Sequence, residues 1–184
     1  MYSILLFLHS LFRWLVLSSL IYAILRAYRG FRSNGGDWSN GGDRSDEGFR
    51  SDGRFRSDGA TRSGRPFTKA DDAIRHWTAT IAHIQLTIGC VLYFTSPLIK
   101  LFFADFKGAL AHPELSFFGM VHVSLMILSI VIITIGSALA KRATADADKF
   151  KIQFRWFSIA LLLIFIAIPW PFSILAGRPL FRTF

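Results

Sequence analysis

Four long apolar segments, separated by polar connections, dominate the pattern of this 184-residue chain. Each is close to the ~20 residues that an α-helix needs to cross ~30 Å of hydrocarbon. None of them contains an aspartate or a glutamate. Hydrophobic residues make up 52% of the sequence, which is too apolar and too segmented for a soluble core of this size. The pattern predicts an all-α integral membrane protein with transmembrane helices over residues 3–27, 77–98, 117–140 and 156–176.

The order of the segments predicts one domain over residues 1–184, an up-down-up-down four-helix bundle in contact with the lipid bilayer. A cleaved secretory signal is an alternative for the first segment. That segment lacks a basic stretch before its apolar run and carries His9 and Arg13 within it. We therefore expect a retained helix.

Basic residues are placed asymmetrically along the chain, whose net charge is +9. In a soluble protein this charge would suggest nucleic acid, but here the connections carry it, and we expect no nucleic-acid partner. Cytoplasmic loops of membrane proteins are enriched in lysine and arginine. The first and third connections are therefore expected to be cytoplasmic and both termini outward, since the second connection and the C-terminal tail contain only Lys100, Lys107, Arg178 and Arg182.

Two connections differ in kind. Residues 30–65 repeat SNGGD and FRSDG, and a composition so rich in Gly, Ser, Asp and Arg predicts a disordered cytoplasmic insertion. Residues 99–116 carry apolar side chains at helical spacing, which predicts a short amphipathic helix at the outer interface or a continuation of the second helix. Asp105, His112 and Glu114 form only a weak candidate metal site there, and solvated loop is favoured.

Three histidines, His9, His83 and His122, lie inside three different apolar segments. An ionisable side chain within hydrocarbon is costly, so it marks a functional site by default. A neutral imidazole offers a lone pair to iron without adding charge, which suits the axial positions of b-type haem. Hydrogen bonding between helices is the structural alternative for each of them.

Depth separates the three histidines. At 1.5 Å per residue, His9 lies ~9 Å and His122 ~8 Å below the outer boundary, whereas His83 lies ~9 Å from the inner one. His9 and His122 are therefore the predicted axial pair, on diagonally opposed helices. His83 pairs with either only if its helix is shifted by about two turns, and it otherwise suits a quinone carbonyl, a proton relay or a second site.

Two neighbours of this pair are candidate cofactor contacts. Arg13 follows His9 by four residues, on the same helix face, and a haem propionate would supply the anion that an intramembrane arginine needs. Gly119 shares a stripe with His122, and small side chains there leave room for a flat macrocycle. Close helix packing explains the glycines of that stripe nearly as well.

Several motifs resemble a family of small four-helix bacterial membrane proteins named cytochrome b-like. They are HSLFRW (9–14), FTKADD (67–72), AHIQLTIG (82–89), LYF (92–94), ITIGSALAKRATAD (133–146) and IAIPW (166–170). The resemblance spans all four helices and departs from the family in the 30–65 insertion and after Trp170. It implies haem b and membrane redox chemistry in the bacterial cytoplasmic membrane, with His9, His83 and His122 matching the motif histidines.

Other chemistries have less support. Cys90 stands alone in the second segment, which excludes an intramolecular disulfide or a thiolate cluster within the chain. No nucleophile with an adjacent base, phosphate-cradling loop or acid pair is present, so electron transfer is favoured over an enzyme with its own substrate. Two alternatives stay open: a non-redox helical subunit of a larger membrane complex, and a metal- or quinone-handling membrane protein. Oligomerisation and a membrane redox partner are compatible with each.

Overall fold

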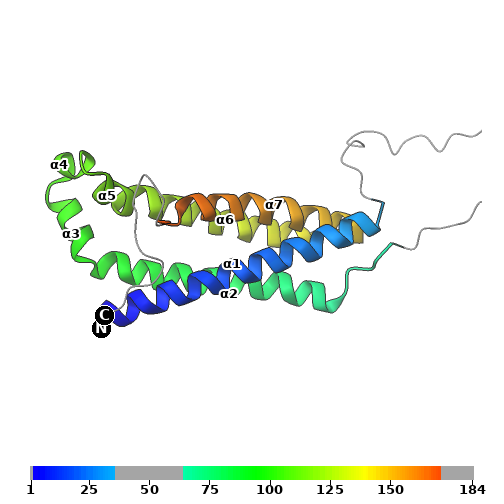
Figure 1. The fold of residues 1–184 in the computed structure, drawn as a ribbon. Coiled ribbons are helices and arrows are strands. Elements are labelled where there is room, and N and C mark those ends of the chain that lie inside the picture. The colour runs from blue at the N-terminus through cyan, green and yellow to red at the C-terminus, as the bar shows by residue number, and fades with distance from the viewer. Residues whose placement is uncertain (1, 36–63, 171–184) are drawn as a thin grey trace, which may run out of the picture.

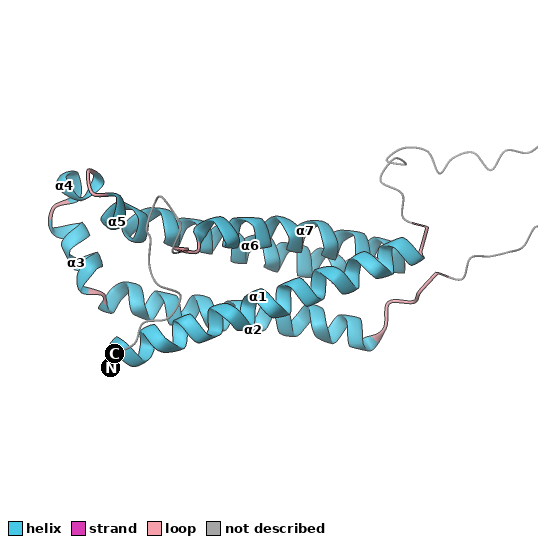
Figure 2. Ribbon diagram, viewed as in Figure 1, coloured by secondary structure: helices cyan, strands magenta, loops and turns pink. Residues whose placement is uncertain are grey.

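The computed structural model describes residues 2–35 and 64–170, and within these ranges every regular element is a helix (Figure 2). Four helices are long and apolar enough to cross a membrane: α1 (Tyr2–Ser33), α2 (Lys69–Thr95), the continuous helix Pro113–Arg142, and α7 (Asp146–Ala167). The third of these consists of α5 (Pro113–Ser116), a π-helix η1 (Phe117–Val121) and α6 (His122–Arg142). The all-α prediction with four candidate membrane helices is confirmed.

The long helices pack side by side as a helical bundle. α1 contacts α2 and α7, and α6 contacts the same two helices, so α1 and α6 occupy opposite corners. The short helices α3 (Pro97–Ala104) and α4 (Phe106–Leu110) cap one end, while the residues that flank 36–63 lie at the other end (Figure 1). Aliphatic and aromatic side chains from all four corners fill the middle, among them Leu20, Ala82, Ile133, Phe157 and Ala160. Large apolar side chains are also exposed along every long helix, as expected of surfaces that face lipid.

The end of α1 and the start of α2 have clear local causes. Both lie at the end of the bundle that flanks residues 36–63, which we call the basic end. α1 ends where Gly35 adopts a positive φ of 71°, a conformation that terminates helices and favours glycine. α2 begins with a capping box, in which the Thr68 hydroxyl accepts from the Asp71 amide and the Asp71 carboxylate accepts from the Thr68 amide. A threonine followed three residues later by an aspartate, ahead of an apolar run, predicts a helix start at Thr68, and the capping box confirms it. The predicted insertion, apart from its ends at 30–35 and 64–65, lies outside the described residues.

Asp71 is also the hub of a buried ion cluster that joins α1 to α2. Its carboxylate is only 2% exposed and lies 2.6 Å from Arg26 Nε and 2.7 Å from Arg65 Nη2. The residue precedes the predicted membrane span of α2 by six positions. Burial raises the pKa of the Asp71 carboxyl, but hydrogen bonds from Thr68 and Arg26 and the charge of Arg65 lower that pKa below its usual range. The group is therefore ionised at neutral pH and holds α1 against the start of α2.

One turn further along, Arg75 ties α2 to α6. Its guanidinium is 5% exposed, lies 2.7 Å from an Asp72 carboxylate oxygen, and donates to the Ser137 carbonyl at 3.0 Å and to the Ser137 hydroxyl. The FTKADD motif thus positions two carboxylates that fix α2 against two different helices.

The connection for which the sequence predicts a short amphipathic helix over 99–116 or a continuation of the second helix forms several short helices. Ser96 adopts extended geometry before Pro97, which ends α2, because the residue before a proline disfavours the helical conformation. The helical run then breaks again at Asp105, whose carboxylate accepts from the Gly108 amide at 3.0 Å and starts α4. The segment is therefore a series of short helices and not a continuation of α2.

The fourth long helix begins before the predicted span over 156–176 and ends within it. α7 begins ten residues earlier, at Asp146, where Asp146 and Asp148 favour the positive end of the helix dipole. It ends at Ala167, because Ile168 precedes Pro169 and adopts extended geometry with a ψ of 129°. Residues 171–176 of the predicted span lie outside the described part of the chain.

The ends of the 36–63 segment meet at one point, which makes its removal testable. Asn34 Nδ2 donates to the Arg65 carbonyl at 3.0 Å, the Arg65 amide lies 3.4 Å from the Ser33 hydroxyl, and Gly64 lies against Asn34. Replacing residues 36–63 with a four-residue Gly-Ser linker should therefore leave unfolding in detergent within about 1 kcal/mol of the parent, because loop-closure entropy changes slowly with length.

Deleting residues 33–64 serves as the comparison, since it also removes Ser33 and Asn34. That variant should unfold at lower SDS fractions than the variant in which the Gly-Ser linker replaces residues 36–63. Loss of folded protein in the linker variant would show that residues 36–63 pack on the bundle.

Candidate functional site

His9 and His122 come together between opposite corners of the bundle. Their ring centroids are 6.4 Å apart, with an angle of 68° between the ring planes. His9 projects from α1, and His122 is the first residue of α6. The depth estimate from the sequence predicts this pair, and both imidazoles lie in the half of the bundle nearest α3.

A π turn places His122. The His122 amide donates to the Phe117 carbonyl, a bond across five residues instead of four. A π turn inserts one extra residue into a helix, and such turns are frequent at functional sites. The Tyr93 hydroxyl donates to the Gly119 carbonyl at 2.7 Å, so α2 satisfies a carbonyl within the irregular turn.

The end of α7 orients the His122 ring. His122 Nδ1 lies 2.8 Å from the Ala167 carbonyl oxygen. Within a longer helix that carbonyl would accept from residue 171, but residue 171 is a proline and has no N–H. A carbonyl oxygen can only accept a hydrogen bond, so Nδ1 carries the proton in this contact and the neutral ring keeps its lone pair on Nε2. This hydrogen bond to a backbone carbonyl is the usual outer-shell partner of a metal-bound histidine.

His9 is held from α2. Gln85 Nε2 donates to the His9 backbone carbonyl at 2.9 Å and lies 3.2 Å from His9 Nδ1. Gln85 Oε1 is buried and has no hydrogen-bond partner within the described ranges. The His9 ring also approaches Gly89 so closely that a β-carbon there would lie 3.3 Å from His9 Cε1. Gln85 and Gly89 are thus site residues that the sequence analysis did not assign, although a glutamine inside the apolar AHIQLTIG motif was the available signal.

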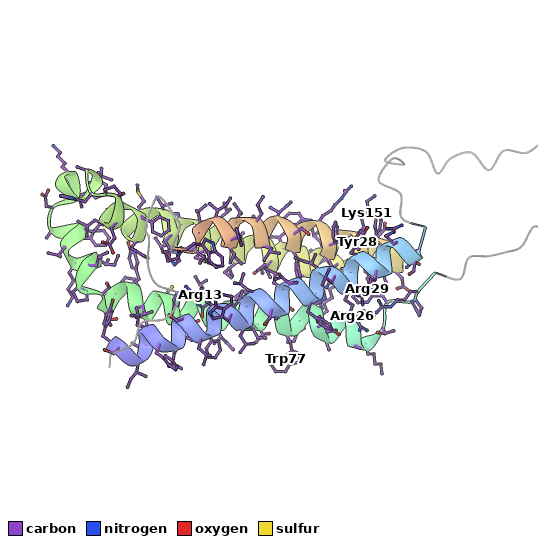
Figure 3. All side chains as sticks on the ribbon, viewed as in Figure 1. Arg13, Arg26, Tyr28, Arg29, Trp77 and Lys151 are labelled. Atoms are coloured by element: carbon purple, nitrogen blue, oxygen red, sulfur yellow. The ribbon has the colours of Figure 1, made fainter. Side chains whose placement is uncertain are left out.

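Arg13 adds positive charge to this region. Its guanidinium carbon is 5.5 Å from the Trp14 ring centroid, and its charge acts on both His9 and His122. Arg13 lies well along α1 from the basic end, where Arg26 and Arg29 are found (Figure 3). A positive charge beside two imidazoles would favour an anionic group on any ligand that the pair binds.

Gly119 has a packing role in this structure. A β-carbon at Gly119 would lie 2.5 Å from the Phe102 ring, and one at Gly136 would lie 2.3 Å from Trp156. Both glycines of the stripe therefore accommodate aromatic side chains, which is the close-packing alternative named above. The role predicted for Gly119 beside a macrocycle stays a prediction.

His83 lies apart from the pair, on the outer surface of the bundle. Its Nδ1 is 2.7 Å from the Ala79 carbonyl, and its Nε2 is 3.2 Å from the Thr134 hydroxyl. Both side chains line a groove of about 290 Å³ between α2 and α6 whose other walls are aliphatic. His83 therefore faces this groove, while His9 contacts His122.

We also looked for groups of metal-binding side chains and for similar known proteins. Within residues 2–35 and 64–170, no group of three or more His, Cys, Asp or Glu side chains could hold a metal ion. Comparisons with protein-family models, curated proteins and solved structures find no match to this chain. The resemblance to the cytochrome b-like family therefore stays a prediction from the motifs.

The hydrogen bond between Tyr93 and the π turn should contribute to the stability of the protein. Tyr93→Phe should lower the free energy of unfolding by about 1–2 kcal/mol, because it leaves the Gly119 carbonyl without its donor. SDS titration of the purified protein in detergent measures this change. Tyr28→Phe makes the same substitution at an exposed hydroxyl, which accepts from Arg32 at 3.3 Å, and it should be neutral. Equal stabilities of the two variants would mean that the Tyr93 hydroxyl does not support the turn.

Proposed function

We propose that this protein is a small membrane cytochrome that binds b-type haem between α1 and α6 and takes part in electron transfer. The observation that carries the proposal is the His9–His122 pair, with 6.4 Å between ring centroids. Two imidazoles bound to opposite faces of one metal, at about 2 Å per metal–nitrogen bond, place their ring centroids about 6 Å apart. The pair therefore suits six-coordinate iron by distance.

The chain's own residues orient the two imidazoles that would hold the haem iron. The Ala167 carbonyl fixes the tautomer and rotation of His122, and Gln85 holds the backbone of His9. Arg13 supplies a cation where a propionate would need one. Haem, when bound, supplies one-electron redox chemistry, and its potential depends on axial ligands, burial and nearby charge.

Charge placement supports a membrane topology for this cytochrome. Arg26, Arg29 and Lys151 gather at one end of the bundle (Figure 3), while Lys100 and Lys107 belong to the opposite end. By the positive-inside rule, the basic end faces the cytoplasm and the two histidines lie in the outer half of an up-down-up-down bundle. The bacterial cytoplasmic membrane is the location that the resemblance implies.

A second candidate function is the handling of a quinone at His83. The groove between α2 and α6 offers a histidine and a threonine among aliphatic walls, which suits a ligand with a polar ring and an apolar tail. The Thr134 hydroxyl also lies 2.7 Å from the Ile130 carbonyl. Thr134 can therefore release His83 Nε2 to a ligand hydroxyl without losing its own acceptor. This groove can act beside the haem site or without it.

Substitution of each histidine tests the haem proposal. His9→Ala and His122→Ala should each abolish the low-spin reduced b-type spectrum, because one imidazole cannot hold a six-coordinate iron. His83→Ala is the matched control, since it removes the same side chain from an exposed site, and it should keep the spectrum. The measurement is the dithionite-reduced absorption spectrum per mole of folded protein.

Two outcomes would overturn the assignment. Loss of the spectrum in His83→Ala but not in His9→Ala would make His83 the partner of His122. Identical spectra in all three variants would remove the histidines from the haem site.

Orientation has its own test. A protease added outside intact cells should spare residues 36–63, whereas the same protease on inverted vesicles should cut there, because the basic connections are cytoplasmic. Immunoblotting of the fragments gives the result. Cleavage from outside would reverse the orientation.

A further inference from the structure

A cavity of about 310 Å³ opens at the basic end of the bundle, away from the paired histidines. Lysines from three helices line it: Lys69 is the first residue of α2, Lys141 lies next to the end of α6, and Lys149 lies in the first turn of α7. Phe67 and Ala140 form an apolar part of the wall. The cavity is thus a basic pocket between helices and not a flat charged surface.

The carboxylates nearby offset only part of this charge. Asp72 lines the cavity, but its carboxylate is already 2.7 Å from Arg75 Nη2. Asp146 reaches Lys149 Nζ at 3.3 Å. No carboxylate in the described ranges forms an ion pair with Lys69 or Lys141. The cavity therefore has an excess of positive charge that an anion would neutralise.

The location of the cavity indicates which class of anion it would bind. Lys141 lies one residue beyond the predicted third span, and exposed Trp77 marks the same end of α2, as aromatic residues do at membrane interfaces. Basic pockets between helices on the cytoplasmic side bind lipid headgroups. The apolar wall at Phe67 and Ala140 suits the glycerol and upper acyl region that accompanies a lipid phosphate.

We propose that this cavity binds the phosphate of an anionic phospholipid from the inner leaflet. Lys69, Lys141 and Lys149 contact the phosphate, and the lipid links the starts of α2 and α7 to the end of α6. This lipid site depends on the membrane topology of the proposed function but not on haem. Failure of the haem experiments would therefore not contradict the lipid site.

Native mass spectrometry of the full chain in neutral detergent tests the site, with phosphatidylglycerol and phosphatidylcholine as probes. The parent should retain phosphatidylglycerol in preference to phosphatidylcholine. The triple variant K69Q/K141Q/K149Q should bind phosphatidylglycerol at least tenfold more weakly. K100Q/K107Q/K151Q removes the same charge from residues outside the cavity lining and should bind like the parent. Lys141→Gln alone should give a partial loss, which keeps the test valid if the triple variant does not fold.

Three results would overturn the site. They are equal retention of phosphatidylglycerol by the parent and the lining variant, an equal loss in the control variant, and no preference over phosphatidylcholine. Inorganic phosphate separates the lipid from a soluble ligand. It should not displace bound phosphatidylglycerol at equal concentration, and displacement would assign the cavity to a soluble phosphate compound.

Discussion

Hydrogen bonds between helices satisfy polar groups that would otherwise be buried without a partner, and they organise the half of the bundle that holds the paired histidines. Two helices depart from regular geometry in this half of the bundle, and a third, α2, carries a polar side chain there. The π turn before α6 has its Gly119 carbonyl satisfied by Tyr93, and the end of α7 has its Ala167 carbonyl satisfied by His122. Gln85 of α2 donates to the His9 carbonyl of α1, although its own Oε1 has no hydrogen-bond partner among the described residues. These contacts between helices fix the position of His122 relative to His9.

The opposite end of the bundle sets the register that makes this meeting occur. Asp71 joins α1 to α2, and Arg75 joins α2 to α6, both through largely buried groups. Removing one partner of a buried ion pair typically costs about 3–5 kcal/mol, so helix slippage that separates such partners is strongly disfavoured. A shift of α2 by about two turns, which His83 would need to join either paired histidine, would break both contacts.

The sequence predicts much of this arrangement but not all of its details. Apolar segment length and the Thr68–Asp71 spacing predict the number of long helices and the start of α2. Depth arithmetic pairs His9 with His122. The sequence pattern predicts the end of the fourth helix too late, because apolar residues continue past Pro169 whereas the helix stops before that proline. The π turn has no sequence signal as simple as a cap or a proline, and Gln85 and Gly89 face His9 only because of how α1 crosses α2.

Binding of haem by the His9–His122 pair is the central claim, and the absorption spectrum of the purified full chain tests it most directly. After haem-replete expression, dithionite should produce the sharp bands of a reduced low-spin b-type haem, at about one haem per chain for a single axial pair. Absence of a Soret band from folded protein would contradict the claim and favour a helical subunit in which the histidines serve only as hydrogen-bonding groups.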